Sequence, residues 1–476
     1  MQPSIILPPG WSYGTALPGA RQTGNRIDFD VVPLTMLVDS PLDTGAYYKH
    51  ITLWSGDGTY QMLDVFADHP QDLDFPNALI EKYKHMTPEA LVLYGSRHWD
   101  VYHSLLTLSD AIGFEGIEHH QSSDNRAPAD FFTNPQQQLV AGDLLTHEFS
   151  HSWNGKYRRP FDLIQPNFQS AEHTELLWVY EGMNQYLGDL LSFRMGIRNP
   201  KEYPEYLANV YAELDYEPGR LTTPIIDLTT GAPYFYGAHG DWSSLRRGAG
   251  DFYSEGELIW LDADTIIRQL SGGQKSLDDF LHLFTAPVRT GPITKAYTRT
   301  DVETLLHDVQ PYDWHAFFER YIYEVSVHPP NDDFERAGWR LVYNDKPNAF
   351  ISAQETLDHR VDDWYGIGIR VDDKTAAITA VRPDSAAYNG GLGPSMKIIA
   401  VNGQSYSQDA LQYAIKNAKQ STSPIVLVIE QTGWVKTYSV IYHGGLLYPH
   451  LTRILNKPDM LQAIMSPHAF RGSAPL

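Results

Sequence analysis

The chain contains no cysteine among its 476 residues. Disulfide bonds and thiolate metal sites are therefore excluded, and any metal ion must be bound by histidine, aspartate or glutamate. The 19 histidines supply enough ligands for such a site. Because proteins without cysteine occur on both sides of cell membranes, this absence does not identify a compartment.

Basic residues are scarce, with 36 Lys and Arg against 58 Asp and Glu, which gives a formal net charge of -22. A surface this acidic repels nucleic acids and anionic membranes, so no nucleic-acid partner is expected. The chain also lacks an apolar run of about 18 residues, the length that a membrane span requires. We therefore expect no membrane span.

The first twenty residues, MQPSIILPPGWSYGTALPGA, lack the basic start and the long apolar core of a signal peptide. They are typical of the interior of a β-domain, with a strand at SIIL and a Pro-Gly turn after it. We expect an upstream part to be missing from this chain. The protein is expected to be soluble and of a bacterial type, and either cytoplasmic or exported to a periplasm.

A chain of this length is too long for one ordinary core, so several domains are expected. Short alternating runs up to about residue 60 predict strands, and residues 75–95 predict helices. From about residue 136 the apolar spacing becomes helical, and residues 346–445 are again rich in strands. Further helices are predicted at about 200–214, 255–271, 276–285, 301–309 and 313–324. The pattern indicates an α+β protein of several domains.

The segment THEFSHSWNG places His147 and His151 four residues apart on a predicted helix. Residues at this spacing lie on one helix face, where two imidazoles can bind one zinc ion. Glu148 lies beside the metal, where it can accept a proton from a zinc-bound water. The alternative is a solvated helix face that carries two histidines by chance.

A catalytic zinc site of this kind needs a third protein ligand and an open position. Glu181 lies in the apolar stretch LLWVYEGMNQYL, where an unpaired carboxylate is costly unless it binds a metal. The alternative is a glutamate on the helix surface. Glu172 and Glu175 are rivals, but they lie nearer the helix start, where carboxylates are common. We predict one zinc ion bound by His147, His151 and Glu181.

Four motifs, HEFSHSWN, WVYEGMNQYL, DFYSEGELIWLDADTIIRQL and GIEHHQSSDN, resemble those of the zinc glycyl aminopeptidases that carry a C-terminal PDZ domain. This family belongs to the thermolysin-like group whose third zinc ligand is a glutamate, the gluzincins. The strand-rich stretch with YGIGIRV and PDSAAYNGGLGPSMKIIAVNG is similar to a PDZ domain. Together these stretches cover roughly residues 1–445.

The resemblance implies four parts in chain order. Residues 1–34 would be the end of an N-terminal β-domain, and residues 35–345 a thermolysin-like peptidase domain with a β-rich lobe and a helical lobe. Residues 346–445 would be the PDZ domain, and residues 446–476 a tail.

The resemblance also implies roles for single residues. Glu148 matches the general base, and Glu118, in GIEH, matches the glutamate that binds the free α-amine of the substrate. Gly116 would let a substrate backbone approach closely beside a strand edge. His119 would line the pocket or orient Glu118.

Tyr253, in FYSEGEL, matches a tyrosine whose hydroxyl would stabilise the oxyanion of the tetrahedral intermediate. Its alternative is a packed core tyrosine. The sequence departs from the family at Glu255, where a basic residue is common, and at Glu115, where glycine is common.

In the PDZ-like part, the loop WYGIGI would bind a peptide C-terminus through its backbone donors, which belong to Tyr365, Gly366, Ile367 and Gly368. A structural cap on the catalytic domain is the alternative for this part.

The combined prediction is a zinc aminopeptidase that removes small N-terminal residues, Gly or Ala, from peptides with a free N-terminus. The restriction to N-termini depends on Glu118 and the resemblance, and the Gly/Ala preference on the resemblance alone. The alternatives are a zinc endopeptidase and a non-catalytic, peptide-binding PDZ scaffold.

Overall fold

The structure, a computed structural model, describes residues 1–167, 169–236 and 245–469. The chain divides into two compact units, and neither is one continuous stretch. The first unit comprises Met1–Pro200, Ala263–Trp314 and residues 462–469, and the second comprises Lys201–Asp262 and His315–Leu461. None of the helices in the described ranges is long and apolar enough to cross a membrane.

The first unit begins with short strands, as their alternating sequence predicts. β1 (Ser4–Ile6), β4 (Arg26–Asp28) and β3 (Arg21–Thr23) form a small antiparallel sheet in that order. β2 (Ser12–Thr15) pairs with β5 (Leu42–Gly45), and α1 (Leu34–Val38) lies between β4 and β5 in the chain. Five buried apolar side chains form a small core under these elements: Leu7, Leu17, Ile27, Phe29 and Val32.

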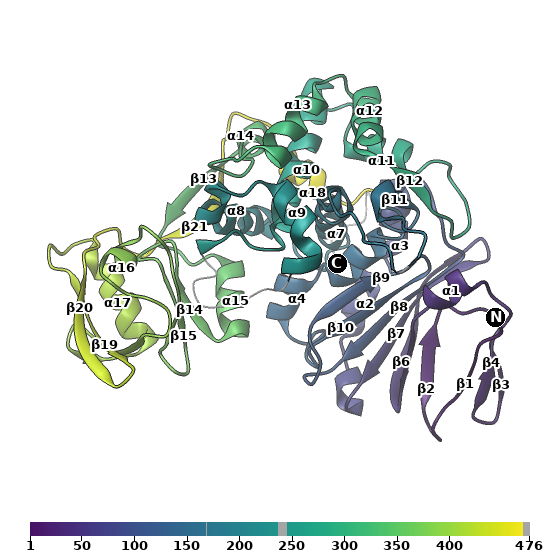
Figure 1. The fold of residues 1–476 in the computed structure, drawn as a ribbon, viewed down its shortest axis with the longest axis horizontal. Coiled ribbons are helices and arrows are strands. Elements are labelled where there is room, and N and C mark those ends of the chain that lie inside the picture. The colour runs from purple at the N-terminus through teal and green to yellow at the C-terminus, as the bar shows by residue number, and fades with distance from the viewer. Residues whose placement is uncertain (168, 237–244, 470–476) are drawn as a thin grey trace. The chain divides into compact units, whose positions relative to one another are not determined.

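A five-stranded sheet is the main β-structure of this unit, with the order β6-β7-β8-β10-β9 (Figure 1). Its strands are β6 (Tyr47–Gly56), β7 (Thr59–Ala67), β8 (Val101–Leu108), β9 (Glu115–Glu118) and β10 (Ser122–Ala127). A two-residue turn, Asp57-Gly58, joins β6 and β7, and both residues have positive φ, as such hairpin turns require. β9 is an antiparallel edge strand, paired with β10 alone.

Helices complete the first unit. α2 (Asn77–Tyr83) and α3 (Met86–Tyr94) connect the parallel strands β7 and β8, and the predicted helices at 75–95 are confirmed. The other helices are α4 (Pro135–Ala141), α5 (Leu144–Ser150), α6 (Leu177–Tyr180), α7 (Gly182–Arg194), α11 (Leu277–Phe284) and α12 (Arg299–Val309). β11 (Arg158–Pro160) and β12 (Lys295–Tyr297) form a parallel pair.

Two predicted helices are interrupted. The helical pattern from about residue 136 forms α4 and α5 with a break at Gly142 and Asp143. The helix predicted to carry Glu172, Glu175 and Glu181 begins only at Leu177 and is broken at Glu181. Gly182, a poor helix former, follows the break. The second interruption lies at the predicted ligand Glu181, and the first lies four residues before the predicted ligand His147.

The second unit begins with α8 (Tyr203–Asp215) and α9 (Ile225–Phe235), and the division between the units falls within α10 (Asp251–Leu270). α13 (Trp314–Phe318) continues into a short π-helix at Glu319–Tyr323, and α14 (Asp332–Arg336) and α15 (Ala349–Asp358) follow. The helices predicted at about 200–214, 255–271, 276–285, 301–309 and 313–324 are all confirmed within a few residues.

A β-rich module spans residues 360–440 within the second unit. One sheet has the order β14-β15-β16, and the other has the order β18-β17-β19-β20. The strands are β14 (Arg360–Asp363), β15 (Ile369–Asp372), β16 (Ile378–Val381), β17 (Lys397–Val401), β18 (Gln404–Ser405), β19 (Ile425–Gln431) and β20 (Trp434–Val440). α16 (Ala386–Asn389) and α17 (Gln408–Ala418) join them around one core that includes Ile369, Val381, Leu411 and Leu427.

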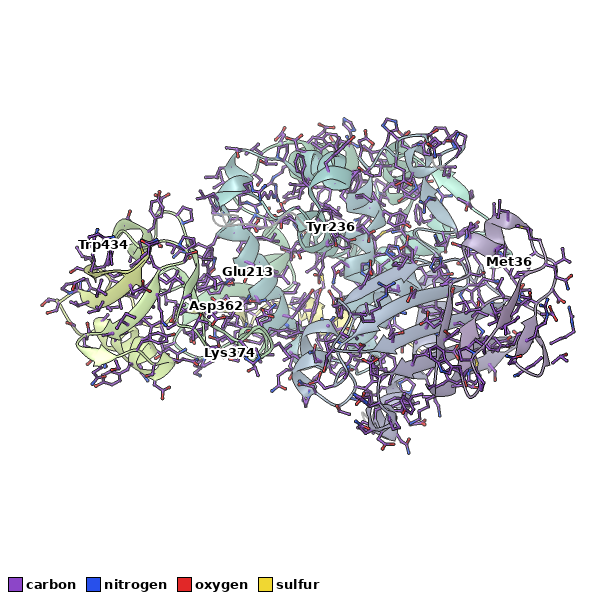
Figure 2. The ribbon with its side chains drawn as sticks, turned by 60° about the horizontal axis from the view of Figure 1, so that its bottom comes forward. Met36, Glu213, Tyr236, Asp362, Lys374 and Trp434 are labelled. Carbon is purple, nitrogen blue, oxygen red and sulfur yellow. The ribbon has the colours of Figure 1, made fainter. Side chains whose placement is uncertain are left out.

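An ion-pair cluster ties this module to α8. The Arg370 side chain on β15 pairs with Glu213 of α8 and with Asp362 of β14, and its Nε lies 2.8 Å from Asp362 Oδ2. Figure 2 labels the two carboxylates. Because the guanidinium is shared between both elements, it fixes the module against α8 within the second unit.

The segment after residue 446 differs from the predicted tail. β21 (Tyr448–Arg453) pairs antiparallel with β13 (Trp339–Asn344) over six residues, and α18 (Met460–Met465) follows. Tyr448 and Leu451 are buried at 4% exposure each. The local sequence shows no strong strand pattern. The strand forms by pairing with β13, about 110 residues earlier in the chain, and a local pattern does not reveal such a partner. Residues 470–476 of the predicted tail lie outside the described residues.

We expect Leu451→Ala to lower the free energy of unfolding by about 2–4 kcal/mol, because it removes buried apolar surface and leaves a cavity. The matched control is Leu455→Ala, since Leu455 is 93% exposed. Urea unfolding followed by tryptophan fluorescence measures both. If both variants unfold like the parent protein, β21 is not part of the folded core.

Candidate active site

Three predicted metal ligands converge in the first unit. His147 lies on α5, His151 follows the last residue of α5, and Glu181 lies between α6 and α7. The His151 Nε2 atom is 3.1 Å from His147 Nε2 and 3.2 Å from Glu181 Oε2, and His147 Nε2 is 3.4 Å from the same oxygen. Two elements that are thirty residues apart in the chain thus present three ligand atoms to one point.

These distances fit a zinc ion. Ligand atoms about 2.0–2.1 Å from a tetrahedral centre lie about 3.3 Å from one another. The three separations of 3.1, 3.2 and 3.4 Å agree with that value. His151 and Glu181 are 1% and 14% exposed at their side chains, so the three ligand atoms meet in a largely dry space. The residues present therefore fit the predicted metal.

Hydrogen bonds orient the second histidine and join the two ligand-bearing segments. His151 Nδ1 lies 3.0 Å from the Asn154 carbonyl oxygen, which directs Nε2 toward the other ligands. The same carbonyl accepts a hydrogen bond from Asn184 Nδ2 on α7, and Asn154 Nδ2 donates to the Val179 carbonyl on α6. Asn154 therefore holds the end of the histidine segment against the start of the glutamate segment.

Glu148 lies beside the triad and is 6% exposed. Its Oε2 atom is buried and accepts no hydrogen bond from the described residues. Burial raises the pKa of Glu148 to about 8, and the charges of Glu118 and Glu181 add to the increase. A bound dication would favour the carboxylate form. A buried carboxylate with an unused oxygen is suited to accepting a proton.

Two glycines allow the close approach that forms the site. A Cβ on Gly116 of β9 would lie 2.2 Å from Glu148 Oε1 and 2.8 Å from its Cγ, so the base occupies the space where a side chain would be. A Cβ on Gly188 of α7 would lie 2.8 Å from the His147 Cα atom, so α5 and α7 touch at that point. Gly116 was predicted to receive substrate backbone, and the structure places it against the predicted base.

Glu118 ends β9 next to these groups. It forms a second cluster with Glu148 and His151, whose ligand-type atoms all lie within 4.8 Å of one another. Tyr180 Oη donates a hydrogen bond to Glu118 Oε1, and Arg159 Nη1 donates to Tyr180 Oη over 3.1 Å. Burial would raise the pKa of Glu118, but the charges of His151 and Lys156 lower it below its ordinary value. Glu118 is thus a fixed carboxylate at the site.

His119 is directed elsewhere by its contact with Asp39. Its Nδ1 atom lies 3.2 Å from Asp39 Oδ1, and Asp39 also binds His120 Nδ1 at 2.8 Å and Lys156 Nζ at 3.1 Å. This cluster ties the β9–β10 turn to the segment after α5. The contact with Asp39 favours neither of the roles predicted for His119, pocket lining or orientation of Glu118.

Tyr253 belongs to the second unit, in the first turn of α10, where it stacks on Phe252 with ring centroids 4.9 Å apart. Its predicted part in catalysis stays a prediction. Glu255, two residues along, is 1% exposed and accepts hydrogen bonds from Arg220 and Arg247. The departure from a basic residue at this position thus makes a buried ion-pair cluster. Glu115, the other departure, forms a surface pair with Arg126.

The predicted peptide-binding loop of the β-rich module is buried. Tyr365 is 3% exposed, and its ring lies 5.6 Å from that of Tyr216, the residue after α8, and 6.0 Å from that of Tyr343 on β13. Ile367 is fully buried in the module core, and Gly366 and Gly368 are buried as well. Elements of the second unit therefore cover this loop.

Several residues of the site were missed by the sequence reasoning. The sequence offers a weak signal for Asn154 and Asn184, because each follows a predicted metal ligand by three residues, in HSWN and EGMN. Tyr180 directly precedes Glu181, but nothing local indicates that it bonds a carboxylate 62 positions upstream. Arg159 and Asp39 act through contacts that only the fold creates.

Comparison with known proteins adds to this geometry. Residues 141–259 match the sequence profile of the M61 glycyl aminopeptidase family. The matched segment contains the three ligands, Glu148 and Tyr253, whereas Glu118 and the β-rich module lie outside it. No curated protein matches the chain in sequence.

Solved structures with a similar fold include an aminopeptidase N family protein from Idiomarina loihiensis. It is 18% identical, with a TM-score of 0.75, and the alignment covers 98% of this chain and 80% of that one. At this identity the likeness shows a shared fold. An M1 zinc metallopeptidase from Deinococcus radiodurans aligns with 16% identity over 69% of this chain and 65% of its own, at a TM-score of 0.43.

The ligand triad, the buried glutamate beside it and the family match over the same segment agree with one another. The chain is a zinc-dependent peptidase, a hydrolase of peptide bonds.

We expect Gly116→Ala to reduce kcat/KM for peptide hydrolysis by about 100-fold or more, because the new methyl group displaces the Glu148 carboxylate. Zinc content should be unchanged, since the three atoms nearest to that methyl group all belong to Glu148 and not to a predicted ligand. The control is Gly113→Ala, where a Cβ meets nothing within 4 Å. Equal activity of both variants would mean that Glu148 does not act from its observed position.

Proposed function

We propose that the protein is an aminopeptidase that hydrolyses the first peptide bond of substrates with a free N-terminus. The observation that carries this proposal is the fixed carboxylate of Glu118 beside Glu148 and His151. An exopeptidase of this kind must recognise a cation about one residue away from the bond that it cleaves. A buried carboxylate held by Tyr180 supplies an ionic partner for an α-ammonium group.

The geometry also supports how the amine would be held. Tyr180 donates one hydrogen bond to Glu118 Oε1, and the Glu118 carboxylate has further acceptor positions for an ammonium group. Arg159 fixes the Tyr180 hydroxyl from the other side. Because β9 is the edge of the sheet, a substrate backbone can align beside it. Glu118 at the end of that strand would then bind the α-ammonium group of the substrate and leave no room for a residue before it.

Glu148 is the proposed general base. A zinc ion bound by His147, His151 and Glu181 would polarise the scissile carbonyl and lower the pKa of a water molecule. Glu148 accepts the proton of the attacking water and returns it to the leaving amine. The Tyr253 hydroxyl is proposed to donate to the oxyanion. We propose one ion at this site, since the three ligands share a single centre.

A preference for small N-terminal residues, Gly or Ala, is part of the proposal. It is supported by the family match alone, over residues 141–259. The space beside Glu148 is consistent with a small side chain, because Gly116 brings β9 within contact distance of that carboxylate.

We propose that the β-rich module, which is PDZ-like in its strand and helix order, acts as a structural part of the second unit. Its loop Tyr365–Gly368 is packed under α8 and β13 and is not open to a peptide C-terminus. The shared ion pair of Arg370 with Glu213 and Asp362 adds to this attachment.

Replacement of Glu118 tests the exopeptidase proposal. We expect the parent protein to release nitroaniline from Gly- and Ala-p-nitroanilide but not from N-acetyl-Ala-p-nitroanilide. Glu118→Gln should lower kcat/KM for the free amines about 10–100-fold, the value of a charged hydrogen bond of about 1.5–3 kcal/mol. Glu115→Gln, on the same strand but 49% exposed at its side chain, is the matched control.

Two outcomes would contradict the proposal. Equal cleavage of blocked and free substrates by the parent protein would indicate an endopeptidase. A Glu118→Gln variant that keeps its full preference for free amines would remove this residue from amine recognition. Glu148→Gln, with zinc content measured in the same samples, should be inactive and provides the background rate.

Replacement of Tyr253 tests the oxyanion role. We expect Tyr253→Phe to reduce kcat about 100-fold with little change in KM, because the lost hydrogen bond forms only in the transition state. Tyr413→Phe is the control, since Tyr413 is 69% exposed on the β-rich module. A raised KM with unchanged kcat would assign Tyr253 to substrate binding instead.

A further inference from the structure

A second cluster of ionisable side chains lies in the first unit, on three neighbouring strands of the five-stranded sheet. Asp64 of β7 is 1% exposed at its side chain, and its Oδ1 atom lies 2.6 Å from His50 Nδ1 on β6. Its Oδ2 atom lies 2.7 Å from His103 Nδ1 on β8. One buried carboxylate thus holds two imidazoles.

The strand register places this cluster on the face of the sheet opposite to the zinc site. Glu118 is aligned with Ser123 and through it with Ser104, so these residues share one face. His103 precedes Ser104 on β8 and therefore points to the other face. Asp64 is aligned with His50 across β6 and β7 on that other face. The cluster is separate from the catalytic machinery.

A cavity of about 640 Å³ lies over the cluster. The β2 strand packs across β6 and β8, and the chain that follows it forms one wall. Figure 2 labels Met36, which belongs to the same N-terminal segment and also lines the cavity. The size is in the range of sites for small organic ligands, about 300–1,000 Å³.

Asp64 already uses its hydrogen-bonding capacity. Tyr48 Oη donates to Asp64 Oδ1 over 2.5 Å, in addition to the two imidazole contacts. Because each imidazole gives its Nδ1 hydrogen to Asp64, the Nε2 atom is the group left for a ligand. Neither Nε2 atom has a hydrogen-bond partner among the described residues. Two oriented imidazoles therefore face the cavity without a partner at their second nitrogen.

The ion pair with Asp64 favours the cationic form of His50. The hydrogen bond from His50 to Asp64 raises the pKa of His50. Burial would raise the pKa of Asp64, but the hydrogen bonds from His103 and His50 lower it below its ordinary value. With both imidazoles protonated, the cluster carries one net positive charge. Other ionisable groups near them are Tyr48, Tyr13, Tyr60, the exposed Asp100, which pairs with Arg289, and Asp43 of β5, whose charge interacts with that of Asp64.

The remaining wall supplies hydrogen-bond donors and apolar surface. The amide of Gln121 and the hydroxyls of Tyr13 and Tyr60 line the cavity together with Leu17 and Met36. We propose that this cavity binds a small organic carboxylate, whose oxygens accept hydrogen bonds from Nε2 of His50 and His103 while its apolar part packs on Leu17 and Met36.

Other ligand classes fit less well. A zinc ion needs three or four protein ligands, and this cluster offers two imidazole nitrogens beside a carboxylate that already accepts three hydrogen bonds. Inorganic phosphate would leave the apolar wall without a partner. A carboxylate with an apolar chain uses both kinds of surface.

Isothermal titration of the zinc-loaded protein at pH 6 tests the proposal, with hexanoate as the probe. We expect hexanoate to bind, and His103→Gln to weaken its affinity at least tenfold. Ala20→Trp should do the same by filling the cavity from an exposed position, with both imidazoles left intact. His315→Gln, whose side chain is 67% exposed in the second unit, should bind like the parent protein.

Zinc content and peptidase activity should be unchanged in all three variants, since none of these residues belongs to the active site. Hexanoate affinity that neither His103→Gln nor Ala20→Trp reduces would overturn the proposal, as would equal affinity for 1-hexanol. Binding of inorganic phosphate without hexanoate would reassign the cavity to inorganic anions. A second zinc ion that is lost in His103→Gln would reassign it to a metal. If His103→Gln does not fold, Ala20→Trp decides alone.

Discussion

Three polar atoms from His147, His151 and Glu181 lie within 3.4 Å of one another in a largely buried space, and much of the first unit is arranged to keep them there. Nitrogen lone pairs and a carboxylate oxygen at such separations are costly without a cation between them. The Asn154 carbonyl, which receives hydrogen bonds from both ligand-bearing segments, resists the separation that would relieve this cost. The fold thus holds the three ligand atoms at separations that suit a single ion.

Close backbone contact places Glu148, the proposed base. Glu148 shares α5 with His147, but its carboxylate rests on Gly116, which belongs to the edge strand β9. On the far side of α5, Gly188 brings α7 against the His147 backbone. α5 is therefore held between a strand and a helix at positions without side chains. The proposed base and the carboxylate proposed to bind the amine both depend on the same short strand, because Gly116 and Glu118 are two residues apart on β9.

The part of the site that depends on local geometry could be predicted from the sequence. A spacing of four residues on a helix brings His147 and His151 together whatever the rest of the chain does. Glu181 was found because a carboxylate among apolar residues needs a partner. The bond from Tyr180 to Glu118 could not be predicted, since it depends on how α6 meets β9. The pairing of β21 with β13, and the burial of Tyr365 under α8, likewise arise from contacts between distant segments.

The helix predictions failed at two points where the observed helices are interrupted. The apolar spacing continues through Asp143 and Glu181, yet the helices break at both. The spacing of apolar residues indicates which side of a helix faces a core. It does not indicate where the helix is interrupted. The short helices α4, α5 and α6 therefore lie where helices were predicted, but the predicted helices were continuous and the observed ones are interrupted.

The alternation of side chains along β8 links the two faces of the sheet. Tyr102 Oη donates a hydrogen bond to the Glu148 carbonyl on one face, and the next residue, His103, binds Asp64 on the other. A strand has a period of two, so a shift of one residue exchanges its faces. An insertion or deletion within β8 would present an imidazole to α5 and a phenol to Asp64. Evolution can therefore vary the cavity and the peptidase site by substitution, but it cannot change the length of this strand without disturbing both.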